Sequence, residues 1–191
     1  MKTLKVLVPV AAAALVASPA LAHVGPGAHD SFAAGFGHPF SGLDHMLAMV
    51  AVGLWAAMLG GRALILVPAA FVGVMVLGFI AGAAGVPLPF VEPAILASVV
   101  VLGLLVALAL PMSALAGGAL VGFFALFHGH AHGTEVGTAG FLAYGAGFVA
   151  ATVLLHVIGI VSGIALGRFG PVLLRVAGGA TALGGLMLMA G

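Results

Sequence analysis

Long apolar runs that contain almost no charged residue dominate this chain and limit what it can fold into. Of its 191 residues, 64% are hydrophobic and 5% are charged. A soluble domain of this length needs a larger polar surface to face water. Several of the runs approach the ~20 residues that cross the hydrocarbon core of a bilayer as a helix. The sequence therefore predicts an integral membrane protein made of helices.

The start of the chain has the parts of a secretory signal peptide. A basic start at 1–5 precedes an apolar run at 6–17, and the segment ends at Ala22 in a small-x-small cleavage pattern. An uncleaved first membrane helix is the alternative, but the apolar run is short for a span. We therefore predict a signal peptide over 1–22, whose removal leaves His23 as the mature N-terminus.

Roughly six further apolar runs follow, each near the ~20 residues of a membrane span. They lie near 41–60, 63–85, 94–110, 113–131, 138–166 and 171–190. The short connections between them predict a single domain over 23–191. The predicted fold is all-α, a polytopic membrane helix bundle with six transmembrane helices after a cleaved signal peptide. Glycines four residues apart, as at Gly78 and Gly82, favour close helix packing in such a bundle.

The arginines indicate how the bundle is oriented. A cleaved signal peptide leaves the mature N-terminus in the periplasm, and counting spans from there places three arginines at cytoplasmic ends, as the positive-inside rule expects. They are Arg62, Arg168 and Arg175. The predicted location is the bacterial inner membrane, with Glu92 and two histidine-containing segments, 38–45 and 128–135, on the periplasmic side.

The first of these segments places two imidazoles and a carboxylate around the start of a predicted span. These candidate metal ligands are His38, Asp44 and His45. Ionisable groups at membrane depth usually mark an ion path or a reactive site. A capping box between Ser41 and Asp44 is the alternative. Because a helix cap leaves both histidines unexplained, we favour the ligand interpretation.

The second segment follows Phe127 and alternates histidine with small residues before a carboxylate. Its candidate ligands are His128, His130, His132 and Glu135. If the segment is extended, all three imidazoles face one side. If it is helical, only His128 and His132 share a face. Either geometry predicts a site for a divalent transition metal, whereas a solvated, pH-sensitive loop is the alternative.

Three further residues are candidates for metal contact. His156 lies within the fifth predicted span, where it either binds the metal ion deeper in the membrane or bonds to a neighbouring backbone carbonyl. Met49 stands one helical turn after His45 and so shares its face, although plain core packing explains it as well. His23 would offer an imidazole together with the mature amino group, in a segment otherwise typical of a terminal tail.

These residues carry a resemblance to a known family. The segment 38–56, with the sequence HPFSGLDHMLAMVAVGLWA, resembles the signature of the HupE/UreJ family, and the segment 127–135 fits as well. The resemblance implies a secondary permease for nickel or cobalt that supplies hydrogenase or urease maturation. It also implies that His38, Asp44 and His45 take part in transport, without enzymatic activity or a prosthetic group.

Two other functions use the same residues. In an intramembrane hydrolase, three histidines and an aspartate would hold zinc and activate water, with Glu135 as the acidic candidate for the base. A metal-binding accessory protein without transport is the other alternative. The formal charge of +1 includes Lys2 and Lys5 of the signal peptide, so it predicts no nucleic-acid partner. The composition leaves the oligomeric state open, with a homo-oligomer among the candidates.

Overall fold

The computed structural model describes residues 31–136 and 140–191, and their regular structure is helical throughout. This confirms the all-α class for the described part of the chain. The helices are α2 (Phe32–Gly37), the 3-10 turn η1 (His38–Phe40), α3 (Leu43–Leu59), α4 (Ala63–Ala83), α5 (Val91–Ala107), α6 (Ala114–Glu135), α7 (Phe141–Gly167) and α8 (Pro171–Ala190). The predicted signal peptide and His23 lie outside the described residues.

Four of these helices are long and apolar enough to cross a membrane. They are α4, α6, α7 and α8. A fifth candidate is the pair made of 32–40 and α3, which bends by 83° at the break between its parts. Helix α5 is apolar but has 17 residues, about 26 Å of helix, which is shorter than a usual span. The structure thus supports four or five of the six predicted spans by length and composition.

Two predicted boundaries were wrong, both beside the polar segments. The sequence placed the start of the third span after Pro93, but helix α5 begins at Val91. A proline is tolerated in the first turn of a helix, because the N–H that it lacks would have no partner within the helix. Helix α6 runs on to Glu135, whereas we expected a connecting segment from His128. Its histidines are buried against neighbouring helices, so they extend the helix rather than end it.

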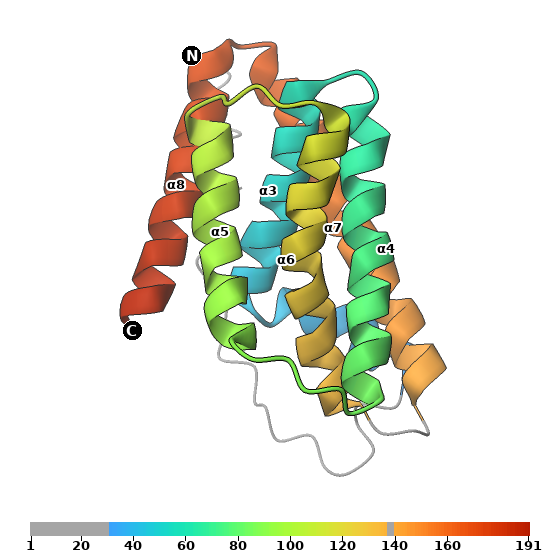
Figure 1. Cartoon of the computed structure of the whole chain (residues 1–191). Coiled ribbons are helices and arrows are strands. Elements are labelled where there is room, and N and C mark those ends of the chain that lie inside the picture. Colours follow the sequence, from blue (N-terminus) through green and yellow to red (C-terminus); the bar gives the residue numbers. More distant parts are fainter. Residues whose placement is uncertain (1–30, 137–139) are drawn as a thin grey trace.

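The long helices pack side by side as one bundle (Figure 1). The most extensive contacts join α4 to α6, α3 to α7, and α5 to α8. Helix α3 also contacts α4, α5 and α8, which makes it central to the bundle. Accordingly, two of its largest side chains, Met49 and Trp55, are fully buried.

Helices α4 and α6 touch backbone to backbone through glycines on both. A Cβ added at Gly78 or Gly82 of α4 would collide with carbonyl oxygens of α6. A Cβ at Gly129 or Gly133 would likewise collide with carbonyl oxygens of α4, at Met75 and Phe79. The glycines that alternate with histidine therefore serve helix packing.

Replacing Gly129 with alanine is expected to destabilise the protein by about 1–3 kcal/mol, because its Cβ would overlap backbone atoms that cannot move aside. The measurement is the thermal unfolding midpoint of the detergent-purified protein. Gly73→Ala is the matched control, since a Cβ there meets nothing within 4 Å and alanine favours the helix. Equal midpoints for the two variants would contradict the packing argument.

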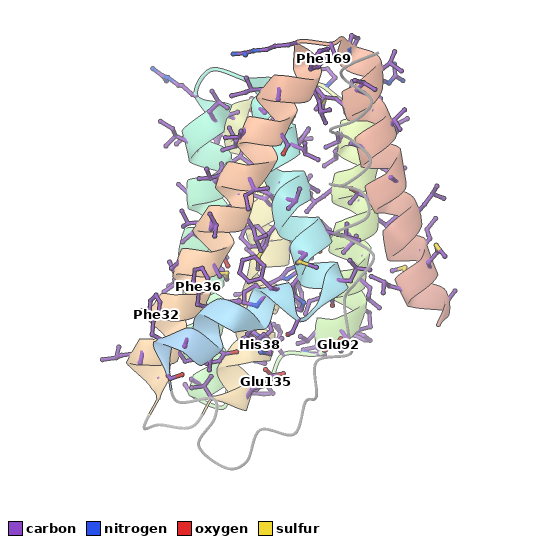
Figure 2. The ribbon with its side chains drawn as sticks, turned by 180° about the vertical axis from the view of Figure 1, so that it is seen from behind. Phe32, Phe36, His38, Glu92, Glu135 and Phe169 are labelled. Carbon is purple, nitrogen blue, oxygen red and sulfur yellow. The ribbon has the colours of Figure 1, made fainter. Side chains whose placement is uncertain are left out.

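A short elbow, made of α2 and η1, crosses the end of the bundle before α3 begins (Figure 2). The Ser31 side chain caps α2 by accepting a hydrogen bond of 3.0 Å from the Ala34 N–H. Gly35 and Gly147 allow α2 and α7 to approach closely, because a Cβ at either would strike the backbone of the other helix. The sequence did not predict this elbow, which carries His38 to the end of α6.

Candidate metal-binding site

Three potential ligands meet where the elbow crosses the end of α6. One nitrogen or oxygen atom from each of His38, His132 and Glu135 lies within 4.8 Å of the other two. His38 Nε2 is 3.7 Å from Glu135 Oε2, and His132 Nδ1 is 3.4 Å from the same oxygen. The Glu135 side chain is 48% exposed and that of His132 is 3% exposed. The group therefore reaches from the surface of the bundle into its interior. Figure 2 shows His38 and Glu135 near each other at the end of the bundle.

His45 and Asp44 extend this group inward. His45 Nε2 lies 2.6 Å from His132 Nε2, which joins the first polar segment directly to the second. On its other side, His45 Nδ1 lies 2.8 Å from Asp44 Oδ1. The Asp44 carboxylate can only accept a hydrogen bond, so Nδ1 of a neutral His45 carries the proton. The lone pair of His45 is then on Nε2, which faces His132. We call His38, Asp44, His45, His132 and Glu135 the histidine–carboxylate cluster.

Proton counting shows that this cluster favours an added cation. Asp44, His45, His132 and Glu135 form a row with contacts of 2.8, 2.6 and 3.4 Å. Each contact needs one proton, because otherwise two lone pairs face each other. Two neutral imidazoles bring only one N–H each, so the row between two ionised carboxylates lacks a proton. A further proton or a metal ion supplies the missing positive charge.

His128 lies next to the cluster in a fully buried position. Its ring centre is 5.1 Å from that of His45. The Ser98 hydroxyl donates to the Ile95 carbonyl at 2.6 Å, so its oxygen accepts the N–H of His128 Nε2 at 2.9 Å. This assigns the lone pair to Nδ1, which is buried without a hydrogen-bond partner among residues 31–136 and 140–191. His128 thus presents a free ligand nitrogen to the interior.

His130 is turned away from the cluster. Its Nε2 donates a hydrogen bond of 2.7 Å to the carbonyl of Val86, in the connection between α4 and α5. The segment is helical, so only His128 and His132 share a face, and the extended alternative is wrong. His130 therefore anchors α6 to the connection between α4 and α5 and does not join the other imidazoles in the cluster.

The capping box is also wrong. Helix α3 has Gly42 at its N-cap, with no side-chain hydrogen bond there. The Ser41 hydroxyl donates a hydrogen bond of 2.6 Å to the His38 carbonyl, at the end of η1. Asp44 accepts the His45 backbone N–H at 2.8 Å as well as the imidazole. The Asp44 carboxylate therefore bonds to His45 and does not close a capping box. This removes the capping explanation, which competed with a role for Asp44 in the cluster.

The two remaining candidate ligands in the described residues, Met49 and His156, lie apart from the cluster. Met49 is fully buried one turn beyond His45, and His156 is buried deeper along α7. Glu92 is exposed in the first turn of α5, at the same end of the bundle as His38 and Glu135 (Figure 2). The structure therefore places Met49 and His156 in the interior and Glu92 on the surface near the cluster.

Sequence reasoning missed the residues that surround the imidazoles. Phe148 lies 4.6 Å from His132 and Tyr144 lies 6.0 Å from His38, measured between ring centres. Phe71 contacts His128 in the same way at 5.6 Å. Ser98 orients His128, and an isolated hydroxyl in an apolar helix was the signal that could have identified it. Aromatic residues in apolar helices give no such signal, because most of them are core.

Comparisons with known proteins find relatives over the whole chain. Residues 11–188 match the model of a family described as HupE / UreJ protein. The chain is 50% identical over 194 residues to a protein of Rhizobium leguminosarum bv. viciae named Protein HupE, and the alignment covers 100% of each chain. No solved structure matches the chain. The similarity thus includes both segments that build the cluster.

Proposed function

This chain belongs to the HupE / UreJ family, and we propose that it is a permease carrying nickel or cobalt across the bacterial inner membrane. The observation that carries the proposal is the row of contacts from exposed Glu135 through His132 and His45 to Asp44. With both carboxylates ionised and both imidazoles neutral, its three contacts hold only two protons. Imidazole and carboxylate together suit borderline divalent cations. Nickel supplied in this way would serve the maturation of a hydrogenase or urease.

The depth of each ligand suggests how the cation would proceed. Glu135 and His38 meet the hydrated ion at the surface, and His132 and His45 replace its water further inside. Asp44 compensates part of the ion's charge, which matters because the start of a helix carries partial positive charge. His128 then offers the next nitrogen. Removing a cation from water is costly, so replacing its ligands stepwise keeps each loss small.

The arginines support the direction proposed for transport. Helix α3 runs from His45 to the turn that holds Arg62, and α7 runs from Tyr144 to Arg168. Both arginines therefore lie at the end opposite the cluster, where Figure 2 also shows Phe169. Positive charge favours the cytoplasmic side. We infer that the cluster faces the periplasm and that transport runs inward.

The hydrolase alternative has less support from the structure. An enzyme needs room for a lipid or peptide beside its reactive group. A groove of about 360 Å³ beside α4 and α7 is lined by apolar side chains such as Met75, Phe79 and Phe141, and none of the cluster residues lines it. Glu135, the candidate base, already contacts two imidazoles. A carrier or a metal-binding accessory protein needs no such substrate pocket.

Uptake into liposomes tests the proposal. The full chain is reconstituted with a metal-sensitive dye inside, and nickel, cobalt or zinc is added outside. We expect nickel and cobalt to enter faster than in protein-free liposomes, and His130→Gln to transport normally because that imidazole points elsewhere. No uptake above the protein-free control would refute the permease. A product released from lipid or peptide substrates would support the hydrolase.

Acid is expected to slow uptake, because a proton and a metal ion compete for the same imidazole nitrogens. Ligation requires neutral imidazole, so the initial rate should fall as the external pH drops through about 6.5, the ordinary pKa of histidine. The measurement varies the external pH while the internal buffer stays constant. Acceleration by acid would contradict competition and would indicate that protons drive transport.

A further inference from the structure

His156 is a buried polar group that the cluster does not use. It lies twelve residues beyond Tyr144 on α7, about 18 Å deeper into the bundle. The residue is 2% exposed, and neither Nδ1 nor Nε2 has a hydrogen-bond partner in the part of the chain that the structure describes. A buried imidazole without hydrogen-bond partners is unfavourable, because it has lost its hydrogen bonds to water. The explanation based on a neighbouring backbone carbonyl therefore fails, and the position calls for a ligand.

One aromatic ring connects His156 to the histidines above it. Phe71 of α4 meets His156 edge to face, with ring centres 5.0 Å apart at 89°. The same ring lies 5.6 Å from His128, whose Nδ1 is also buried without a partner. Two imidazoles with free nitrogen atoms thus flank a single side chain. His156 is consequently the next nitrogen ligand below His128 among the described residues.

A groove on the outer face of the bundle reaches His156. It lies between α4 and α7, has a volume of about 490 Å³, and is lined by His156 among apolar side chains, of which Ile65 and Val157 are exposed. Pro68 sits inside α4 and has no N–H to donate, so the Leu64 carbonyl loses its ordinary helical partner. The groove is thus bordered by a buried imidazole and by a residue whose backbone oxygen lacks its helical partner.

We infer that His156 forms an inner binding site for the transported cation, separate from the histidine–carboxylate cluster and reached past His128 and Phe71. The inference rests on the proposed permease function, because only a cation that leaves the cluster inward would meet this imidazole. His156 Nε2 or Nδ1 supplies the ligand, and water or a carbonyl oxygen completes the shell. The site has no carboxylate nearby in the described residues, so it releases the cation more easily than the cluster does.

A single introduced thiol tests this site, because the chain has no cysteine of its own. In His156→Cys, a small positively charged methanethiosulfonate reagent should react with the thiol, since the reactive thiolate forms only where water and ions reach it. The matched control is Leu154→Cys, at nearly the same depth but 40% exposed on the outer surface of α7. Both variants are measured as full chains in liposomes.

We expect His156→Cys to react about tenfold faster than Leu154→Cys, because the lipid-facing thiol stays protonated. Added nickel should slow the reaction at His156→Cys about fivefold through occupancy and leave Leu154→Cys unchanged. His156→Gln keeps a polar group of similar size, and its maximum uptake rate should fall about tenfold, which corresponds to 1.4 kcal/mol. Its nickel affinity at the cluster should remain that of the wild type, which also shows that the variant folds.

The outcomes separate this site from the permease itself. If the wild type takes up nickel but nickel protects neither thiol and His156→Gln transports at full rate, the inner site is wrong and the permease stands. If the wild type takes up no nickel, the permease proposal fails. Protection of His156→Cys by nickel in that case would not support the inner site, because the introduced thiolate is itself a nickel ligand.

Discussion

Replacing Asp44 with asparagine is expected to reduce nickel uptake about a hundredfold, a loss of about 2.7 kcal/mol. Asparagine has nearly the same shape but no charge, so the row from Asp44 to Glu135 would no longer lack a proton. With the amide N–H donated to His45 Nδ1, the ring carries its own proton on Nε2, which then has no lone pair for the cation. Uptake into dye-loaded liposomes measures the loss.

Ser41→Ala is the matched control for this substitution. Ser41 bonds only to the His38 carbonyl, at the end of η1, and does not cap α3. Its removal should change uptake less than twofold. A large loss in Ser41→Ala together with normal uptake in Asp44→Asn would reverse our assignment and restore the capping explanation. Equal amounts of folded protein, verified by gel filtration, are required before the rates are compared.

Substitutions of His45 and His132 are expected to be strongly non-additive. Their Nε2 atoms are 2.6 Å apart, so either substitution alone already destroys the shared part of the site. Each alanine variant should weaken nickel binding about a hundredfold, and the double variant should lose little more. The coupling energy is therefore expected to be about 3 kcal/mol, at the upper end of the range typical of contacting residues. Isothermal titration of the purified protein measures it without transport.

The pair of His45 and His130 provides the control cycle. His130 is bonded to the Val86 carbonyl and makes no contact with His45, so the two effects should simply add. If the His45 and His132 variants were equally additive, the cation would not bind between them. The binding cycle would then exclude the row as the site, whatever the transport assay gives.

Several features could be predicted from sequence because they depend on local composition. Predominantly apolar runs such as 63–85 and 171–190 match α4 and α8 closely, since a segment with so few polar side chains has few alternatives to a buried or lipid-facing helix. Asp44 and His45 could be identified as candidates because ionisable groups are rare in such a chain. The pattern at 128–135 indicated a metal site, but not which of its imidazoles would meet.

Other features could not be predicted because they depend on contacts between distant residues. Gly129 and Gly133 appeared to be part of a polar loop until their partners on α4 were known. His130 resembled its neighbours until the connection between α4 and α5 supplied a carbonyl for it. Phe71 gave no signal at all, although its ring contacts two of the imidazoles.

By itself the sequence determined that this chain is an all-helical membrane protein of the HupE / UreJ family, since hydropathy and a contiguous motif are local properties. Only the tertiary structure decided which ligands form one site. His45 and His132 are 87 positions apart in the chain, and they meet because α3 and α6 lie in one bundle, in which α3 packs on α7 and α4 packs on α6 through glycines. The proton missing from their row arises from that meeting, because neither segment lacks a proton on its own.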